Sequence, residues 1–295
     1  MMDPVKVKYS RRFKKEKAIL MTLGEQPLHA FSFETLVQLI ENNRASWELA
    51  PTTPAKKTIE RFLRNNILTQ QEIFFSEEEK YLRYTYEDPS PLEIAVSLHP
   101  KAYLSHYSAA ALLNLTTQVP KTIYTTVEES MRIGPTGGDL NQKAIDHAFS
   151  QPQRRPAYKK ARIGDYEIQL LTSKYTDRAG VLAAARIPHT GIERTLIDLA
   201  VRPAYSGGAF LVLDMYRQAV VQGISATKIV NWLDKFRYIY PYHQSIGFLL
   251  EKAGYAGKAL AALKELPMEF DFYLDYGMQE KEYSKTWRLY YPKGM

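Results

Sequence analysis

The chain has 295 residues, of which 45% are hydrophobic and 24% charged, a composition typical of proteins that fold around buried cores. Its net charge of +7 favours a polyanionic partner such as nucleic acid, and its lack of cysteine excludes disulfides, thiolate zinc sites and cysteine nucleophiles. No apolar run approaches the roughly 20 residues that span a bilayer, and residues 18–23 are too short for a secretion signal, so we expect a cytoplasmic protein with no membrane partner.

The first predicted element is a basic arm. Residues 6–17 carry seven cations against the single acid Glu16. A solvated tail is one interpretation, and an arm along DNA phosphates is the other, because clustered cations release bound counterions. The candidate contacts in the arm are Arg11, Arg12, Lys14 and Lys15.

Two helices are predicted next. Ser32 is a good N-cap, and apolar residues at helical spacing follow it from Phe33 to Ile40. The second helix has Thr53 as its N-cap, Pro54 at its first position, and an end at the asparagines 65–66. Its predicted inner face holds Ala55, Ile59, Phe62 and Leu63, and its outer face holds Lys56, Lys57, Glu60, Arg61 and Arg64.

Two strands, over residues 67–75 and 81–86, complete a first domain at residues 1–88. Helices followed by a hairpin are the order of a winged helix-turn-helix, whose second helix reads the major groove. An ordinary amphipathic surface helix is the alternative. The acidic hairpin tip, residues 77–79, is expected to repel phosphate, so the hairpin flank is favoured for contact. The predicted DNA-binding residues are Thr53, Lys56, Lys57, Arg61, Arg64 and, on the flank, Arg83.

Residues 88–91 contain two prolines and predict a linker to a larger second domain, residues 89–295. In that domain we expect a buried helix over 102–115, strands over 121–127 and 163–171, five helices between 191 and 266, and strands over 269–274 and 283–290. The predicted fold class is α+β, mostly helical, with an N-terminal winged helix-turn-helix and a larger C-terminal α/β domain.

A second basic cluster lies before the strand at 163–171. We interpret it as an exposed loop that is either solvated or binds nucleic acid or an acidic partner protein. Its members are Arg154, Arg155, Lys159, Lys160 and Arg162.

Patterns typical of enzymes are weak. The histidines show no metal-ligand spacing, and the glycine-rich residues 134–138 lack the Gly-Lys-Ser/Thr ending of a phosphate loop. Asp165 and Glu167 alternate on a strand, as in metal-dependent nucleases, but such pairs are common by chance. Arg194 and Asp198 are expected to pair on a helix surface. We therefore predict no catalytic residues, no metal and no cofactor.

Three segments resemble the AbiEi family of antitoxins: YLSHYSAAALLNL at 103–115, IERTLIDLAVRPAYSGG at 192–208 and QSIGFLLEKAGY at 244–255. The resemblance implies an N-terminal winged-helix domain joined to a C-terminal antitoxin domain. It also implies a two-gene toxin–antitoxin operon that acts in abortive infection. The winged helix would bind the promoter DNA of this operon and repress its transcription. The implied partner is a nucleotidyltransferase-like toxin, neutralised through the C-terminal domain with or without direct contact.

Self-association on the promoter DNA stays open. The alternative function is a stand-alone DNA-binding regulator whose larger domain senses a ligand or dimerises.

Overall fold

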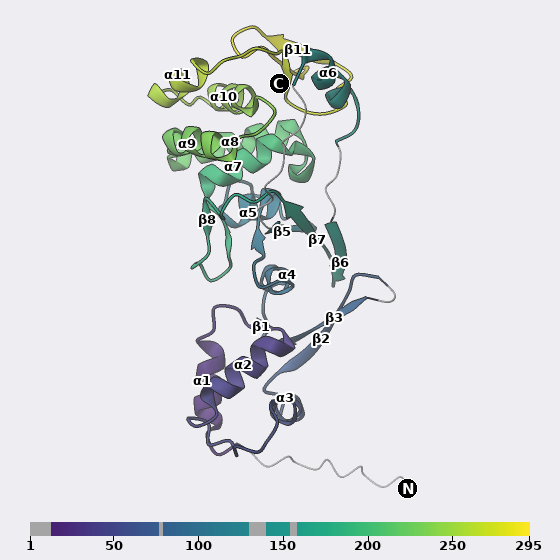
Figure 1. Ribbon diagram of the computed structural model, residues 1–295, viewed down its shortest axis with the longest axis vertical. Helices are drawn as coiled ribbons and strands as arrows, with labels where there is room; N and C mark the ends of the chain where they lie inside the picture. Colours follow the sequence, from purple (N-terminus) through teal and green to yellow (C-terminus); the bar gives the residue numbers. More distant parts are fainter. Residues whose placement is uncertain (1–12, 77–78, 130–139, 154–157) are drawn as a thin grey trace. The chain divides into compact units, whose positions relative to one another are not determined.

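The computed structural model in Figure 1 describes residues 13–76, 79–129, 140–153 and 158–295. The chain is an α+β protein with two compact units. The first unit comprises Met1–Pro100 and Ala161–Gly164, and the second comprises Lys101–Lys160 and Asp165–Met295. The first unit extends beyond the predicted boundary at residue 88 because helix α4 packs against strand β1.

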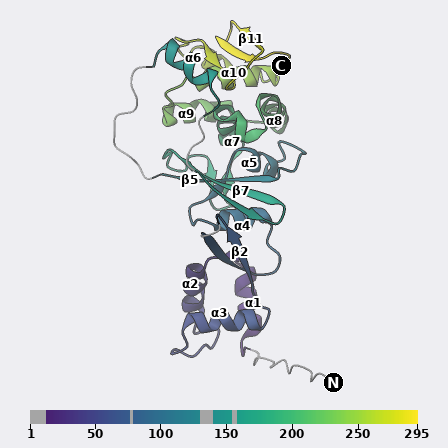
Figure 2. The same cartoon turned by 90° about the vertical axis from the view of Figure 1, so that its right-hand side faces the viewer.

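The first unit holds a helical core and a small antiparallel sheet of order β1-β3-β2. Its elements are α1 (Glu16–Gly24), β1 (Ala30–Phe31), α2 (Phe33–Asn43), α3 (Ala55–Arg64), β2 (Thr69–Phe74), β3 (Lys80–Thr85) and α4 (Pro91–Ser97). In Figure 2, α3 runs crosswise below α1 and α2. Apolar side chains of the three helices surround Trp47 and Phe62, both buried.

Local signals set most of these boundaries. The Ser32 hydroxyl accepts a hydrogen bond from the Thr35 N–H, as expected of an N-cap. Thr53 does not cap α3: Pro54 occupies the cap position, and no side chain caps the helix. Asn66 ends α3 with a φ of 56°, in the left-handed region that asparagine tolerates.

The last two residues of the linker predicted at 88–91 instead begin α4. Ser90 and Glu93 form a reciprocal capping box, and Pro91 occupies the first turn. Proline breaks a helix in its interior but is favoured at the first helical position, and the Ser-x-x-Glu spacing satisfies the free N–H groups there.

The second unit contains a mixed sheet, a group of helices and a small C-terminal sheet. Its first elements are β4 (Tyr103–Leu104), α5 (His106–Leu112), β5 (Thr122–Glu128), α6 (Gln142–Ser150), β7 (Tyr166–Ser173), β8 (Val181–Leu182) and β9 (His189–Thr190). The later elements are α7 (Ile192–Val201), the 3-10 helix η1 (Pro203–Ser206), α8 (Ala209–Gln222), α9 (Ala226–Phe236), α10 (Tyr242–Lys252), α11 (Lys258–Lys264), β10 (Phe272–Tyr273), β11 (Lys281–Ser284) and β12 (Leu289–Pro292). Strand β6 (Tyr158–Ile163) has residues in both units.

Strands β5 and β7 pair in parallel along their length, and β4 pairs antiparallel with β5. The helix predicted over 102–115 is therefore divided, since Tyr103 and Leu104 pair with β5 before α5 begins. The strand predicted over 283–290 is also divided. A turn separates β11 from β12, with Arg288 at a φ of 46°. Helix α6 and strand β6 were not predicted.

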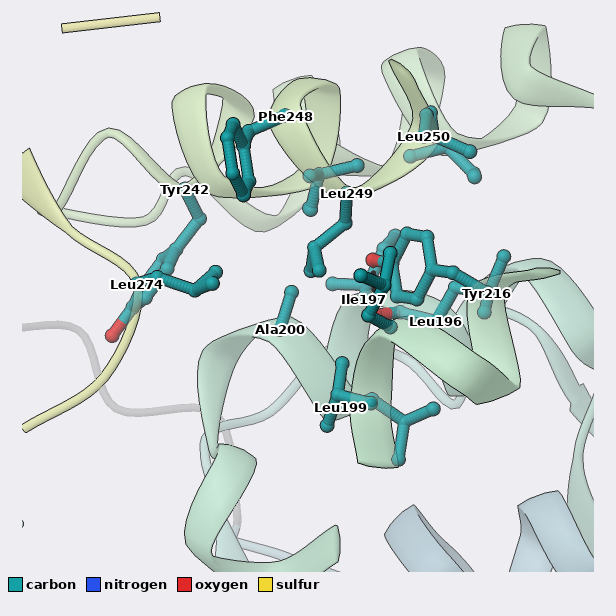
Figure 3. Close-up of a cluster of buried hydrophobic side chains, with 14 of the residues drawn as sticks. Leu196, Ile197, Leu199, Ala200, Tyr216, Tyr242, Phe248, Leu249, Leu250 and Leu274 are labelled. Atoms are coloured by element: carbon teal, nitrogen blue, oxygen red, sulfur yellow. Dashed lines mark hydrogen bonds between the residues drawn. The ribbon is translucent and has the colours of Figure 1, made fainter. Parts of the chain in front are cut away.

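Helix α7 lies at the centre of the second unit's core. Every residue of α7 from Arg194 to Ala200 is buried, because α5, α8, α9 and α10 all pack against it. Figure 3 shows Ile197 and Ala200 of α7 on the side that faces Leu249 of α10, with Tyr216 of α8 beside Leu196. The sequence predicted an amphipathic helix here, and the structure shows one enclosed by other helices.

The C-terminal sheet has the order β10-β12-β11 and is attached to α10 by Gln244. The buried Gln244 amide donates to the backbone oxygens of Trp287 at 2.7 Å and Arg288 at 3.0 Å. Trp287 is itself fully buried, and its indole N–H donates to Glu251 at 2.7 Å.

Gly247, inside α10, is the point where this indole approaches the helix. A Cβ at Gly247 would lie 2.1 Å from the Trp287 ring. Gly247→Ala is therefore expected to destabilise the protein by about 1–3 kcal/mol through overpacking, although alanine normally favours a helix interior. Urea unfolding compared with Gly254→Ala, where nothing lies near the Cβ but φ is 85°, would separate the clash from backbone strain. A stabilised Gly247→Ala variant would contradict the close packing.

Candidate nucleic-acid interface

The outer face of α3 carries an exposed group of cations. Lys56, Lys57 and Arg64 lie on this face, and within the described residues none of the three forms an ion pair. Glu60 is the one acid on this face of α3. The opposite face of the helix packs Ile59 and Phe62 into the core, so the cations are held outward on a fixed helix.

Arg61 differs from its neighbours. It is half buried, and its guanidinium lies 3.7 Å from the centroid of the Phe13 ring. Phe13 also contacts Phe62, with ring centroids 5.1 Å apart. Arg61 therefore joins α3 to the residues before α1 through a cation–π contact, and its replacement would disturb packing as well as charge.

The predicted basic arm is described only in part. Lys14 and Lys15 are exposed, and Lys15 pairs with Glu48 at 3.2 Å. Arg11 and Arg12 lie outside the described residues. An exposed pair such as Lys15–Glu48 contributes little to stability, so Lys15 can exchange this partner for a phosphate at small cost.

Arg83, predicted to contact DNA from an exposed hairpin flank, is buried in the structure. Arg83 is only 6% exposed, and its guanidinium donates to the backbone oxygen of Ser97 at 2.8 Å and to that of Leu82 at 2.7 Å. Burial lowers the pKa of Arg83. The Arg83 side chain joins β3 to α4. The polar sequence of the hairpin did not indicate that a helix would cover Arg83.

Arg44 positions α3, and sequence reasoning missed it. Its guanidinium donates to the backbone oxygens of Ala50 and Thr53, each at 2.9 Å, and to Glu41 at 2.8 Å. These bonds hold the loop that leads into α3. Two of the acceptors are backbone carbonyls, which every residue has. The pattern of side chains therefore could not predict those two contacts. Thr53 itself is half buried in that loop.

Three residues of the second basic cluster lie on a strand. Lys159, Lys160 and Arg162 are exposed residues of β6, not of a loop. Lys160 pairs with Glu167 at 3.3 Å, and Arg162 stands opposite Phe74 where β6 pairs with β2. Arg154 and Arg155 lie outside the described residues.

Of the two carboxylates considered for a nuclease site, Glu167 makes other contacts and Asp165 lies in an exposed turn. Asp165 is exposed in the turn between β6 and β7, and Glu167 accepts from Gln169 at 2.6 Å in addition to pairing with Lys160. Within the part of the chain that the structure describes, no group of three or more His, Asp or Glu residues could hold a metal ion.

Arg194 and Asp198 do pair, at 2.9 Å, but the pair is buried and not on the surface. Their side chains are 4% and 9% exposed because neighbouring helices enclose α7. Arg194 also donates to the Ala179 oxygen at 2.7 Å and to the Thr176 hydroxyl at 3.1 Å.

Among the described helices, none has the length and apolar content needed to cross a membrane.

The sequence matches no protein-family model and no curated protein. A crystal structure of the RV2827C protein from Mycobacterium tuberculosis matches the chain with a TM-score of 0.54 at 15% identity, over 96% of this chain and 93% of that one. The chain therefore shares its fold with the RV2827C protein.

Proposed function

We propose that the first unit is a winged helix-turn-helix that binds double-stranded DNA through α3. The observation that carries the proposal is the outward row of Lys56, Lys57 and Arg64 on a helix whose other face is anchored in the core. Cations on a rigid helix can reach phosphates and guanine edges in the major groove. The β2–β3 hairpin that follows α3 is the proposed wing.

We further propose that the protein is an antitoxin that represses its own promoter and neutralises a nucleotidyltransferase-like toxin through the second unit. This step rests on the resemblance of residues 103–115, 192–208 and 244–255 to the AbiEi family. Residues 192–208 form α7 and η1, in the core of the second unit, so we expect that unit to fold and act as a whole.

The DNA proposal predicts the behaviour of the variant Lys56→Gln/Lys57→Gln/Arg64→Gln. Its affinity for the upstream DNA of its own gene is expected to fall roughly a hundredfold or more, because these three cations no longer neutralise phosphates. The slope of log K against log salt concentration should flatten by about 0.9 for each phosphate that is no longer neutralised. Fluorescence anisotropy across a salt series, with scrambled DNA as competitor, measures both quantities.

The matched control is Arg217→Gln/Lys228→Gln/Lys235→Gln, which removes the same charge from exposed residues of the second unit. Its affinity should stay within a few-fold of the unaltered protein. An equal loss in both variants would mean that net charge alone attracts DNA and that α3 has no special part. Co-expression with the toxin gene tests neutralisation separately, since rescue by the Lys56/Lys57/Arg64 variant would assign that activity to the second unit.

A further inference from the structure

The outer face of helix α8 is exposed to solvent along the length of the helix. Its inner face packs Val212, Met215 and Tyr216 into the core of the second unit, where α7 and α10 contact it. Figure 2 shows α8 on the opposite side of α7 from α9. The inner face therefore holds α8 in place, and the outer face is free to contact another molecule.

Four exposed residues follow one another along this outer face and form what we call the α8 stripe: Phe210, Asp214, Arg217 and Val221. Phe210 is 52% exposed and Val221 is 82% exposed. The side chains of Asp214 and Arg217 are 62% and 53% exposed. Spacings of four, three and four residues place all four within about 60° of one another around the helix axis. This is the spacing at which one helix presents a seam to a second helix.

The α8 stripe is symmetric about its midpoint, which lies between residues 215 and 216. Phe210 and Val221 are equally distant from that midpoint, and so are Asp214 and Arg217. A second copy of α8 laid antiparallel across the stripe therefore places Phe210 of each copy against Val221 of the other. It also places Asp214 of each copy against Arg217 of the other. Such a self-complementary patch is what a two-fold interface requires, whereas a parallel arrangement in register would oppose like charges.

The ion pair within the helix leaves both charged groups able to bind a second copy. Arg217 Nη1 donates to Asp214 Oδ1 at 2.8 Å. A guanidinium has five N–H donors and a carboxylate accepts at about four positions, so one such bond uses a small part of either group. Since both side chains are more than half exposed, each can contact the opposite charge of a second copy and keep its own partner.

We propose that the α8 stripe binds a second copy of this chain in an antiparallel, two-fold arrangement. The Asp214 and Arg217 charges set the orientation, and Phe210 and Val221 supply the apolar surface that association covers. The stripe is about 16 Å long. Its contact is therefore smaller than a standard interface of about 1,600 Å², and the dimer is expected to be weak, with a Kd in the micromolar range or above.

The proposal is independent of DNA binding by the first unit. At the nanomolar protein concentrations of a DNA titration this contact is dissociated, so the control variant that contains Arg217→Gln keeps its purpose. The test is sedimentation velocity of the full chain without DNA, from nanomolar to high micromolar concentrations. A reversible shift from monomer to dimer is expected, and a monomer at every concentration overturns the proposal.

Exchanged charges locate the contact and its orientation. Asp214→Arg and Arg217→Asp each create like-charge pairs at both symmetric contacts, so each variant alone should associate at least about tenfold more weakly. An equimolar mixture of the two variants should associate again, because opposite charges then face each other at both contacts. The double variant Asp214→Arg/Arg217→Asp should form a dimer with itself for the same reason. Misfolding of a variant cannot produce this recovery.

The apolar ends of the stripe provide a second check. Phe210→Ser/Val221→Ser should weaken association about tenfold. Ile239→Ser, a change at a residue that is 53% exposed and lies outside the stripe, should leave association unchanged. Undiminished association of the single charge variants, or a mixture that associates no better than either variant alone, overturns the antiparallel contact.

Discussion

Replacing Phe62 with alanine is expected to destabilise the first unit by about 3–5 kcal/mol. The Phe62 ring is fully buried, with centroid distances of 5.1 Å to Phe13 and 6.0 Å to Trp47. Removing it leaves a cavity where α3 meets the rest of the core, and the surrounding helices can close that cavity only in part. Since Phe62 anchors α3, the DNA binding that we propose for α3 should fall together with stability.

Hydrogen exchange measured by mass spectrometry separates the two units in this experiment. Peptides of α1, α2 and α3 should lose protection, while those of α7, α8 and α10 should keep it. Phe74→Ala is the control, because Phe74 is 50% exposed and its loss should change stability by about 0.5 kcal/mol or less. Equal protection in Phe62→Ala and Phe74→Ala would show that Phe62 is not a core anchor.

Replacing Arg194 with methionine is expected to destabilise the second unit by about 3–5 kcal/mol. The change removes the partner of the Asp198 carboxylate, which is buried and already has one unsatisfied oxygen. It also removes the bonds from Arg194 to Thr176 and Ala179, which hold the loop before β8 against α7. Urea unfolding followed by circular dichroism measures the change in stability.

The exposed pair Arg217–Asp214 provides the comparison. Its atoms are also close, at 2.8 Å, but its side chains are 53% and 62% exposed. Arg217→Met should therefore cost no more than about 1 kcal/mol. The double variant Arg194→Met/Asp198→Leu should recover part of the stability, because it leaves no unpaired charge. A cost for Arg194→Met as small as that for Arg217→Met would contradict the burial of the pair.

The candidate interface was predictable where local pattern and burial agree. The period of Ala55, Ile59 and Phe62 placed α3 to within two residues and indicated that Lys56, Lys57 and Arg64 face outward. Arg61, predicted on the same outer face, is half buried against Phe13. Arg83 had the same polar character as Lys56. The structure buries it because α4, which follows it in the chain, folds back over β3.

The amino-acid sequence by itself determined the class of fold, the main helices of both units and the basic outer face of α3. These features depend on hydrophobic periodicity, capping residues and turns, all of which act over a few neighbouring residues. Only the tertiary structure decided that Arg83 joins β3 to α4, that Arg44 holds the loop before α3, and that Arg194 and Asp198 are buried. A polar group is buried when elements from other parts of the chain cover it. A local sequence pattern does not predict which elements those are.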